Sequence, residues 1–350
     1  MGEFADLAQA AERPVVVAGH GIRLAGMHQA FRTWLEMAKI PCVLTWTGAD
    51  LLPTEHPQNM GILGMCGQRR ANAIVHDADL LIVLGSHLSL TQTGSATELF
   101  SPNSKRVFVN VDQAQLDNLT VRCDLAIHAD LREWLKAPPP AFKAWNFSAY
   151  AGIQPFPMEG AYALNYDMTK RLPEGTVIVV DGGGTALYTG FQSSYIKEGS
   201  RLICSTAISA MGSGLPEAVG ACFANNRKLT TCIIGDGSMM LNVQELQTIR
   251  THNLPIKIFM ISNEGYLAIR HTQAQFQEGR YYGTGAPDIT FPRWGELART
   301  FGIGFTRRTV GALNREGPMI CEWLCDPVQP MLRQGFVDRK PLPLNQMVFQ

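Results

Sequence analysis

The sequence predicts an α/β protein made of two doubly wound, parallel-sheet domains. Short apolar strand candidates alternate with segments of helical spacing along most of the 350 residues, and this alternation is typical of parallel sheets covered by helices. The length suits two domains of ordinary size. A proline run, Pro138-Pro139-Pro140, interrupts the pattern. We therefore expect a first domain over residues 1–137, a linker over 138–157 and a second domain over 158–350.

Apolar runs predict five strands in the first domain. They lie at Pro14–Ala18, Cys42–Trp46, Leu80–Gly85, Val107–Val111 and Leu125–His128. Helical spacing predicts helices at Met27–Lys39, Gln68–His76 and Asp130–Leu135. The turn Gly19-His20-Gly21 follows the first strand, but it lacks the third glycine of a dinucleotide-binding fingerprint. It is therefore only a weak indication of a nucleotide site.

The second domain begins with a helical pattern at Glu159–Leu172. Apolar strands are expected at Val177–Asp181, Leu229–Ile234, Ile256–Ile261 and Met319–Leu324. Between the second and third of these strands, residues 238–253 carry apolar side chains at close to helical spacing and end before a proline. This pattern predicts one continuous helix, Ser238–Asn253.

Composition excludes several classes of protein. The formal net charge is zero and charged residues are only 17% of the chain, so nucleic acid is not an expected partner. No apolar run approaches the roughly 18 residues that cross a membrane, and the first residues lack a basic region followed by a hydrophobic stretch. The eight cysteines lie scattered, mostly in apolar segments, as in reduced proteins. We expect a cytoplasmic protein without a membrane partner.

Oxygen-bearing residues follow two strands of the second domain. Asp236 comes after Leu229–Ile234, and Asn263 comes after Ile256–Ile261. Parallel strands joined by a helix place both residues at the carboxyl edge of the sheet, where open α/β sheets bind ligands. The Asp236 carboxylate, the Asn263 amide oxygen and the Gly265 carbonyl would suit Mg²⁺. An ordinary turn is the alternative for Gly-Asp-Gly by itself.

Glycines at two strand ends can bring the backbone close to a phosphate. Gly237 and Ser238 lie where a helix begins, so their N–H groups can hold a diphosphate. Three glycines and Thr185 also follow the strand Val177–Asp181. Such a run permits the close approach that phosphate cradles need, and a common loop is the alternative.

The chain resembles the thiamin-diphosphate enzymes of the acetolactate synthase and pyruvate decarboxylase superfamily. Their signature appears here as GDGSMMLNVQELQTIRTHNLPIKIFMISNEGY, and its continuation, LAIRHTQ, is most similar to the acetolactate synthase branch. In the first half, AERPVVVAGHGIRLAGM, GILGMCGQRRAN and DADLLIVLGSHLSLTQTG resemble the central domain of the same enzymes. The resemblance extends over most of the chain.

The resemblance implies a site for thiamin diphosphate and Mg²⁺, the metal being held by Asp236, Asn263 and Gly265. Met211 matches the apolar residue that wedges under the cofactor, and the carbonyl of Ser209 would accept a hydrogen bond from the aminopyrimidine. Met211 as simple core filling is the alternative. The cofactor-binding residues that the resemblance implies are Gly183, Gly184, Thr185, Ser209, Met211, Gly235, Asp236, Gly237, Ser238, Asn263, Gly265 and Tyr266.

The central-domain resemblance also allows FAD, which is structural rather than redox-active in that branch. Flavin-binding relatives tend to have a stretch rich in arginine and aspartate where this chain has Ser86–Thr91. A packing domain without a ligand is the alternative.

The family's activating glutamate belongs to an N-terminal pyrimidine-binding domain, and this chain begins at the central domain. We therefore expect no catalytic residue in the chain, and activity only with a partner chain that carries a pyrimidine domain or as part of a longer protein. The expected assembly is a homo-oligomer or a complex with such a partner chain. Loss of an acid–base group typically lowers rates about 10²–10⁴-fold. The implied reaction is decarboxylation of a pyruvate-like 2-oxo acid with carboligation. The alternatives are a non-catalytic binding protein and a sugar-modifying carboligase of the same superfamily.

Overall fold

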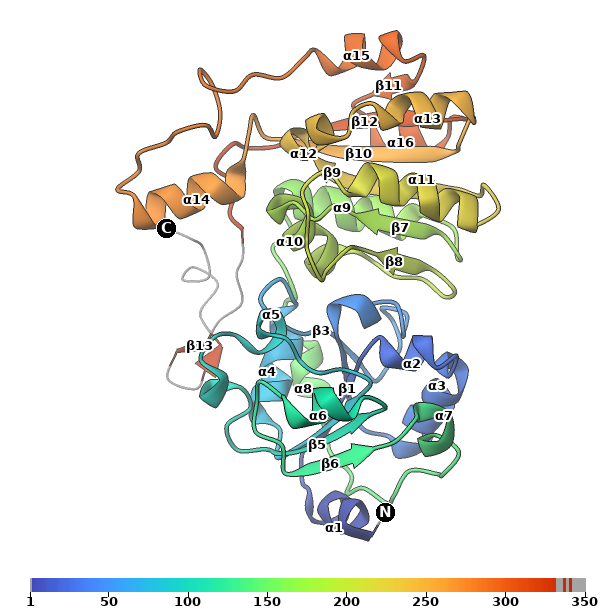
Figure 1. Ribbon diagram of the computed structural model, residues 1–350, viewed down its shortest axis with the longest axis vertical. Helices are drawn as coiled ribbons and strands as arrows, with labels where there is room; N and C mark the ends of the chain where they lie inside the picture. The colour runs from blue at the N-terminus through green and yellow to red at the C-terminus, as the bar shows by residue number, and fades with distance from the viewer. Residues whose placement is uncertain (1, 332–335, 338–339, 342–350) are drawn as a thin grey trace. The chain divides into compact units, whose positions relative to one another are not determined.

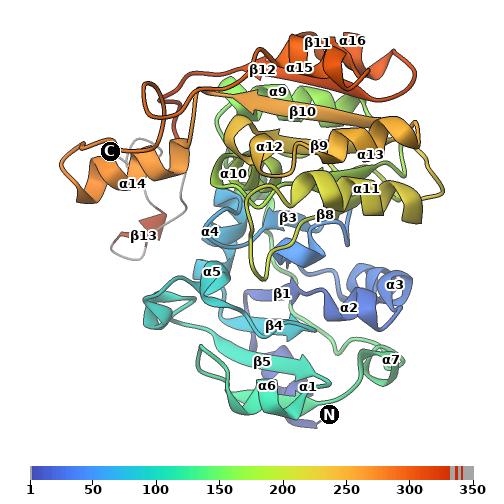
Figure 2. The same cartoon turned by 45° about the horizontal axis from the view of Figure 1, so that its top comes forward.

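The computed structural model describes residues 2–331, 336–337 and 340–341, which form two compact units (Figures 1 and 2). Unit 1 extends to Phe156 and includes the short strands β13 (Phe336–Val337) and β14 (Lys340–Pro341). Unit 2 begins at Pro157. Each unit contains one six-stranded sheet, and all strand pairs within these two sheets are parallel. The predicted fold class is confirmed.

The sheet of unit 1 has the strand order β3-β2-β1-β4-β5-β6. Its strands are β1 (Pro14–Ala18), β2 (Cys42–Leu44), β3 (Asn59–Ile62), β4 (Leu80–Leu84), β5 (Lys105–Asn110) and β6 (Leu125–His128). The helices of this unit are α1 (Gly2–Ala10), α2 (Gly21–Leu24), α3 (His28–Ala38), η1 (Trp46–Gly48), α4 (Arg69–Asp77), α5 (Leu90–Thr93), η2 (Thr97–Leu99), α6 (Gln113–Asp117), α7 (Leu131–Trp134) and α8 (Ser148–Ala151).

The core of unit 1 forms where helix α4 covers one face of the sheet. Val15, Val83 and Phe108 belong to one buried cluster with Ile74 of α4. Aromatic side chains from the segment 138–157 also pack against this cluster, and the Tyr150 hydroxyl donates to Asp77 at 2.7 Å. The segment predicted as a linker therefore lies against the first sheet over part of its length.

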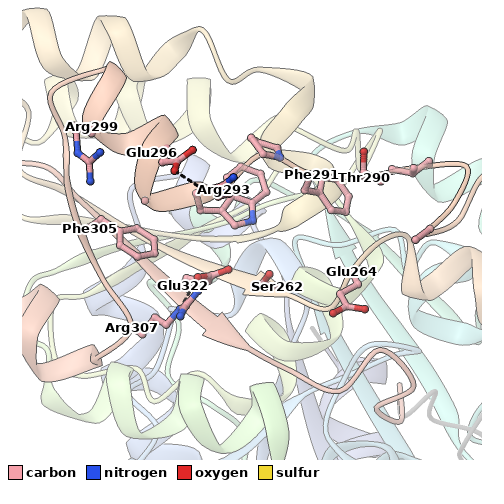
Figure 3. Close-up of a pocket in the computed structure, with 15 residues that line it drawn as sticks. Ser262, Glu264, Thr290, Phe291, Arg293, Glu296, Arg299, Phe305, Arg307 and Glu322 are labelled. Atoms are coloured by element: carbon pink, nitrogen blue, oxygen red, sulfur yellow. Dashed lines mark hydrogen bonds and ion pairs between the residues drawn. The ribbon is translucent and has the colours of Figure 1, made fainter.

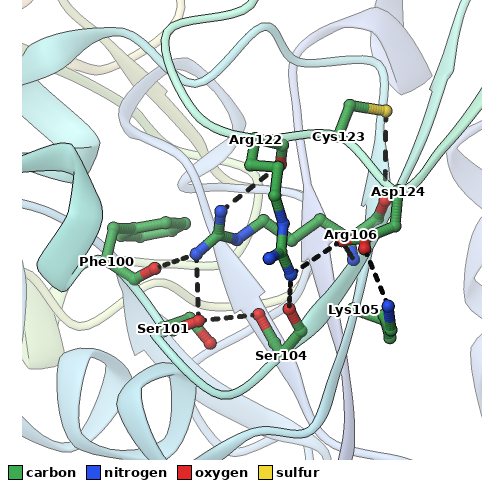
Figure 4. A network of polar contacts seen from close by, with 8 residues as sticks. All are labelled: Phe100, Ser101, Ser104, Lys105, Arg106, Arg122, Cys123 and Asp124. Carbon is green, nitrogen blue, oxygen red and sulfur yellow. Dashed lines mark hydrogen bonds and ion pairs between the residues drawn. The ribbon is translucent and has the colours of Figure 1, made fainter.

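A buried arginine organises the far end of the first sheet (Figure 4). Arg106 of β5 is 5% exposed, and its guanidinium donates to the main-chain carbonyls of Phe100, Ser101 and Arg122. The neighbouring carboxylate, Asp124, accepts from the Arg106 amide and from Lys105. The charge of Arg106 is thus stabilised mainly by carbonyl dipoles, and the arrangement ties the loop before β5 to the segment before β6.

The sheet of unit 2 has the strand order β11-β12-β10-β9-β7-β8. Its strands are β7 (Val177–Val180), β8 (Arg201–Ile203), β9 (Thr230–Gly235), β10 (Ile256–Ser262), β11 (Gly304–Thr306) and β12 (Met319–Leu324). The helices of this unit are α9 (Gly160–Arg171), α10 (Gly184–Ser193), α11 (Gly214–Ala224), α12 (Asp236–Leu241), α13 (Glu245–Thr251), α14 (Leu267–Phe276), α15 (Trp294–Thr300) and α16 (Thr309–Leu313).

Helices cover both faces of the second sheet. On one face, α11, α13 and α15 contribute Leu215, Leu246 and Trp294 to a buried cluster with alternate strand residues such as Ile258. On the other face, α10 lies so close to the sheet that a Cβ at Gly190 would stand 2.6 Å from the Val180 side chain. A doubly wound sheet buried on both faces fits the continuous apolar strands of this half.

The prediction of one helix over 238–253 is wrong. The structure has two helices, α12 and α13, interrupted at residues 242–244. The Asn242 side-chain amide donates to the Gly212 carbonyl at 3.0 Å, and a Cβ at Gly212 would stand 2.7 Å from the Leu241 Cβ. This tertiary contact competes with helix continuation, as Asn side chains often do, and it was not visible in the apolar spacing.

In the part of the chain that the structure describes, no helix is long and apolar enough to cross a membrane.

Candidate functional site

The candidate site lies at the carboxyl edge of the second sheet, where β7 and β9 are neighbours. The chain leaves β7 toward β8 on one side and leaves β9 toward β10 on the other, so this is the topological switch point at which open α/β sheets bind ligands. A pocket of about 150 Å³ opens here. Eleven of the twelve predicted cofactor-binding residues line it, namely Gly183, Gly184, Thr185, Met211, Gly235, Asp236, Gly237, Ser238, Asn263, Gly265 and Tyr266.

Asp236 joins the tips of the two strands that the sequence singled out. Its Oδ1 accepts from the Gly237 amide at 2.7 Å, and its Oδ2 accepts from the amides of Asn263 at 2.9 Å and Gly265 at 3.3 Å. The parallel register that aligns Gly235 with Ile261 brings these tips together. The predicted metal-binding residues therefore lie side by side.

The Asp236 carboxyl is only 1% exposed. Burial raises its pKa from 3.8 to about 6, and the hydrogen bonds from the amides of Gly237, Asn263 and Gly265 oppose that rise. No cation compensates the carboxylate in the contacts that the structure records for it. A buried carboxylate without a counter-ion is costly, so a divalent cation would relieve an electrostatic deficit that the fold already contains.

The other two predicted ligands also fit a hard cation. Asn263 is 1% exposed, and its side-chain Nδ2 has no hydrogen-bond partner among the described residues. Gly265 has φ +141°, and a Cβ there would stand 1.9 Å from the Thr284 carbonyl oxygen. A carboxylate, an amide and a main-chain carbonyl are the oxygen donors that Mg²⁺ takes, with room left for water and phosphate oxygens.

Close backbone approaches form the other wall. A Cβ at Gly183 would stand 2.5 Å from the Ser238 hydroxyl oxygen, and a Cβ at Gly237 would stand 2.1 Å from the Tyr266 ring. Helix α10 begins at Gly184, and the first amides of a helix have no partner within the helix and favour anions. The geometry suits a diphosphate held between α10 and α12.

Asp181 supports the site, although its role was not predicted from the sequence. Its buried carboxylate accepts from the amides of Gly183 at 2.8 Å and Gly214 at 2.9 Å, and also from the Ser238 hydroxyl. Burial raises the pKa of Asp181, and these hydrogen bonds counteract the rise. An acidic residue between an apolar strand and three glycines was the available signal. One side chain thus fixes three segments of the pocket.

Arg270 supports the loop that carries the predicted metal ligands Asn263 and Gly265. Its guanidinium donates to the carbonyls of Asn263 at 3.1 Å and Pro327 at 3.0 Å, and also to that of Glu264. Arg270 belongs to α14, and its side chain is directed toward main-chain groups. The partners are carbonyl groups, which no residue pattern reveals.

The loop over residues 205–213 carries the last two predicted residues. The Met211 side chain is 36% exposed and lines the pocket, with its Cγ 3.7 Å from the position of a Cβ at Gly183. Ser209 has φ +52° and does not line the pocket. Its hydroxyl donates to the Thr206 carbonyl at 3.3 Å. Met211 is therefore available to a ligand, whereas the predicted contact through the Ser209 carbonyl stays a prediction.

Comparison with protein families identifies the class. Residues 1–137 match the model of the thiamine pyrophosphate enzyme central domain, and residues 182–316 match the C-terminal, thiamine pyrophosphate-binding domain of the same enzymes. The chain belongs to the thiamine pyrophosphate (thiamin diphosphate) enzyme family.

Within this family, the chain is similar to acetolactate synthases. The chain is 32% identical over 360 residues to acetolactate synthase isozyme 1 large subunit of Escherichia coli K12, covering 95% of this chain and 62% of that protein. It is 30% identical over 303 residues to the isozyme 2 large subunit, covering 84% and 54%. For the chloroplastic acetolactate synthase 1 of Zea mays the values are 29% over 322 residues, 85% and 50%. The chain thus spans between half and two-thirds of the length of these relatives.

Proposed function

We propose that the chain binds thiamin diphosphate and Mg²⁺ at the β7–β9 switch point and contributes this half of an active site for decarboxylation of a 2-oxo acid with carboligation. The observation that carries the proposal is the Asp236 carboxylate. It is buried without a counter-ion and accepts hydrogen bonds from the amides of Asn263 and Gly265, in the loop that follows β10. A pyruvate-like acid is the proposed donor substrate. The likeness to acetolactate synthase large subunits supports the reaction class.

Each residue of the pocket has a task in this proposal. Asp236, Asn263 and Gly265 hold the metal ion, and the start of α10 with Ser238 holds the diphosphate. Met211, which lines the pocket, would contact the cofactor through its apolar side chain. When bound, thiamin diphosphate supplies the centre that stabilises a carbanion next to a former carbonyl. Asp181 and Arg270 keep the surrounding loops in place through main-chain hydrogen bonds.

Among the residues that the structure describes, those lining the pocket include no acid–base group apart from the proposed metal ligand and Tyr266. We therefore infer that the group that activates the cofactor comes from a pyrimidine-binding domain, in a partner chain or in a longer protein. Exposed apolar side chains on the loop and helix beside the pocket support such a partner, since Ile208 is 82% exposed and Leu241 is 52% exposed. The small number of acid–base groups in the described pocket lining favours the second candidate, a non-catalytic protein that binds the cofactor. A sugar-modifying carboligase remains the third and differs in its acceptor.

Calorimetric titration of the full chain with thiamin diphosphate tests the cofactor site. We expect weak binding that requires Mg²⁺ and that Asp236→Ala abolishes. Asp167→Ala is the matched control, because Asp167 is an exposed carboxylate of α9 paired with Arg171. Equal affinity of wild type and Asp236→Ala would refute the site. Folding of both variants is checked by thermal unfolding.

Mixing with a pyrimidine-domain polypeptide tests the reaction. The chain by itself should form very little acetolactate from pyruvate, and the mixture should form it at a rate about 10²-fold higher or more. Robust activity of the isolated chain would contradict the inference that the activating group lies elsewhere. Stoichiometric binding without activity in the mixture would favour the non-catalytic candidate.

Two smaller proposals accompany this function. FAD is a proposed ligand of the first unit, by likeness to the central domain alone, and residence in the cytoplasm is proposed from composition. The two glycine amides after β1 are already bonded to the carbonyls of Leu84 and Gly85, at 2.8 and 3.0 Å. A flavin diphosphate would therefore need other donors. Flavin fluorescence of the protein purified from cells checks this proposal.

A further inference from the structure

A second and larger cavity lies in unit 2, beyond the tip of β10 (Figure 3). Its volume is about 670 Å³, within the roughly 300–1,000 Å³ of small-molecule sites. The cavity lies at the carboxyl ends of β10, β12 and β11, and its wall includes the segment 289–296 that leads into α15. It shares no lining residue with the pocket around Asp236.

One wall of this cavity, its floor, contains a buried carboxylate and an exposed guanidinium group. Glu322 of β12 is 5% exposed and accepts from Nε of Arg307 at 2.8 Å, while the Arg307 side chain is 61% exposed. Two carboxylate oxygens can accept about four hydrogen bonds, and a guanidinium can donate five. One bond between them leaves capacity on both partners. The hydroxyl of Ser262 lies beside them on the same wall (Figure 3).

The opposite wall is aromatic. The rings of Phe291 and Trp294 are stacked with centroids 5.9 Å apart and planes 26° apart. Figure 3 shows Phe291 across the cavity from Glu322 and Arg307, and Phe305 closes one end. A ligand in this slot would meet flat apolar surface on one side and hydrogen-bonding groups on the other.

Charge decides which class of ligand fits. Three arginines and three glutamates line the cavity, so its formal charge is zero. Two of these residues form the floor pair, and Arg293 and Glu296 form a second pair at 3.0 Å. For a phosphate or for a polyamine, attraction by one set of side chains is opposed by repulsion from the other, so neither gains a net electrostatic attraction. The composition favours a neutral ligand that both donates and accepts hydrogen bonds.

We propose that this cavity binds a neutral, polyhydroxylated ring of the hexopyranose class. The C–H face of such a ring stacks on Phe291, whose ring is only partly buried and is backed by the buried Trp294. Adjacent hydroxyls bridge the floor, one donating to Glu322 and the next accepting from Arg307. This site is independent of the proposed cofactor site, because the two are built from different residues.

Saturation-transfer NMR on the full chain tests the proposal. The probes are methyl α-D-glucopyranoside, methyl α-D-galactopyranoside and methyl α-D-mannopyranoside, with glucose 6-phosphate as the charged comparison. The variants are Glu322→Gln and Arg307→Gln, and the matched control is Glu133→Gln, an exposed glutamate paired with Lys136 in unit 1. Loss of a hydrogen bond to a charged group should weaken binding about tenfold.

We expect saturation transfer to the ring protons of at least one glycoside in wild type and in Glu133→Gln, with a loss of about tenfold in affinity in both cavity variants. Should Glu322→Gln fail to fold, Arg307→Gln decides, because its side chain is largely exposed. Absence of transfer to all three glycosides, equal transfer in all four proteins, or tighter binding of glucose 6-phosphate than of the glucoside would overturn the proposal.

Discussion

Each of the two six-stranded parallel sheets has a topological switch point with glycine-rich turns, between β1 and β4 in unit 1 and between β7 and β9 in unit 2. The two switch points differ in whether a pocket lies between the turns. In unit 1, the turns after β1 and β4 contact each other directly. The Gly21 amide donates to the Gly85 carbonyl at 3.0 Å, and a Cβ at Gly19 would stand 2.3 Å from the same oxygen. In unit 2, the turns after β7 and β9 border a pocket and carry buried carboxylates, Asp181 and Asp236.

The difference shows that glycine at a strand end has two uses. It can let two backbones touch, which closes the crevice, or it can leave room for a ligand beside polar side chains. Glycine spacing does not distinguish these uses. The residues that do are acidic side chains buried without a cation, because they carry a cost that a ligand can relieve.

The largest expected effect concerns the buried acid of the second switch point. The pKa of Asp236 is about 6 in the folded protein and 3.8 in its ordinary state. The folded protein therefore holds this proton between about pH 4 and 6 when the unfolded chain has lost it. The free energy of unfolding of the metal-free protein should fall by about 3 kcal/mol as pH rises through that window.

Urea unfolding in the presence of a chelator, at pH 4 and pH 6.5, measures this contribution. Asp236→Asn removes the titrating group, so the fall with pH should be smaller in that variant. An equal decrease of the free energy of unfolding in wild type and in Asp236→Asn would show that burial does not raise the pKa of Asp236. The contrast with unit 1 would then be lost.

Gly19→Ala should damage the first switch point through packing alone. The new Cβ would meet the Gly85 carbonyl and Ser86, so the free energy of unfolding should fall by about 2.5 kcal/mol. Gly235→Ala is the matched control, because nothing lies within 4 Å of a Cβ there. Its stability should be unchanged or about 0.5 kcal/mol higher. A destabilisation of equal size in both variants would contradict the comparison.

Arg106→Lys tests whether the buried charge of unit 1 serves packing rather than binding. Lysine cannot reproduce the guanidinium fork to three carbonyls, so we expect a loss of about 2 kcal/mol in stability. Arg122→Lys, at a side chain 61% exposed, should cost about 0.5 kcal/mol or less. Thiamin diphosphate affinity measured on the folded proteins should not change in either. A change in affinity would mean that the network does more than hold unit 1 together.

Gly183→Ala should affect cofactor binding, in contrast to Arg106→Lys, and should lower the free energy of unfolding least among the destabilising variants that are not controls. Its Cβ would approach the Ser238 hydroxyl and the Asp181 carboxylate, two side-chain groups at the proposed diphosphate wall. We expect about tenfold weaker Mg²⁺-dependent binding of thiamin diphosphate, by calorimetry, with stability lowered by about 1 kcal/mol. Unchanged affinity would place the diphosphate elsewhere.

Short, mainly apolar segments between turn signals made most of the fold predictable. Pro14–Ala18, Leu125–His128 and Met319–Leu324 have the bounds that the pattern predicted. The strands β8 and β11 were missed because they have only three residues each. The strand β3 was missed because Asn59 and a glycine with φ +99° interrupt its apolar pattern. Their pairing is tertiary information.

The candidate site, too, was predicted only in part. The positions of Asp236 and Asn263 followed from two strand ends and a family motif, and the structure places them in contact. The supporting roles of Asp181 and Arg270 depend on hydrogen bonds to main-chain groups. Backbone amides and carbonyls are the same at every position of a sequence, so such partners appear only after folding.

The tip of β10 alternates between two compartments. Asn263 and Gly265 border the pocket of the predicted metal ligands, and Ser262 and Glu264 border the larger cavity. Residues 263–265 form a bend in which Glu264 has φ +59° and Gly265 has φ +141°, so the alternation comes from this bend and not from the pleat of a strand. Insertion or deletion of a single residue here would change which side chains border each compartment, so we expect homologous chains to keep the length of this segment.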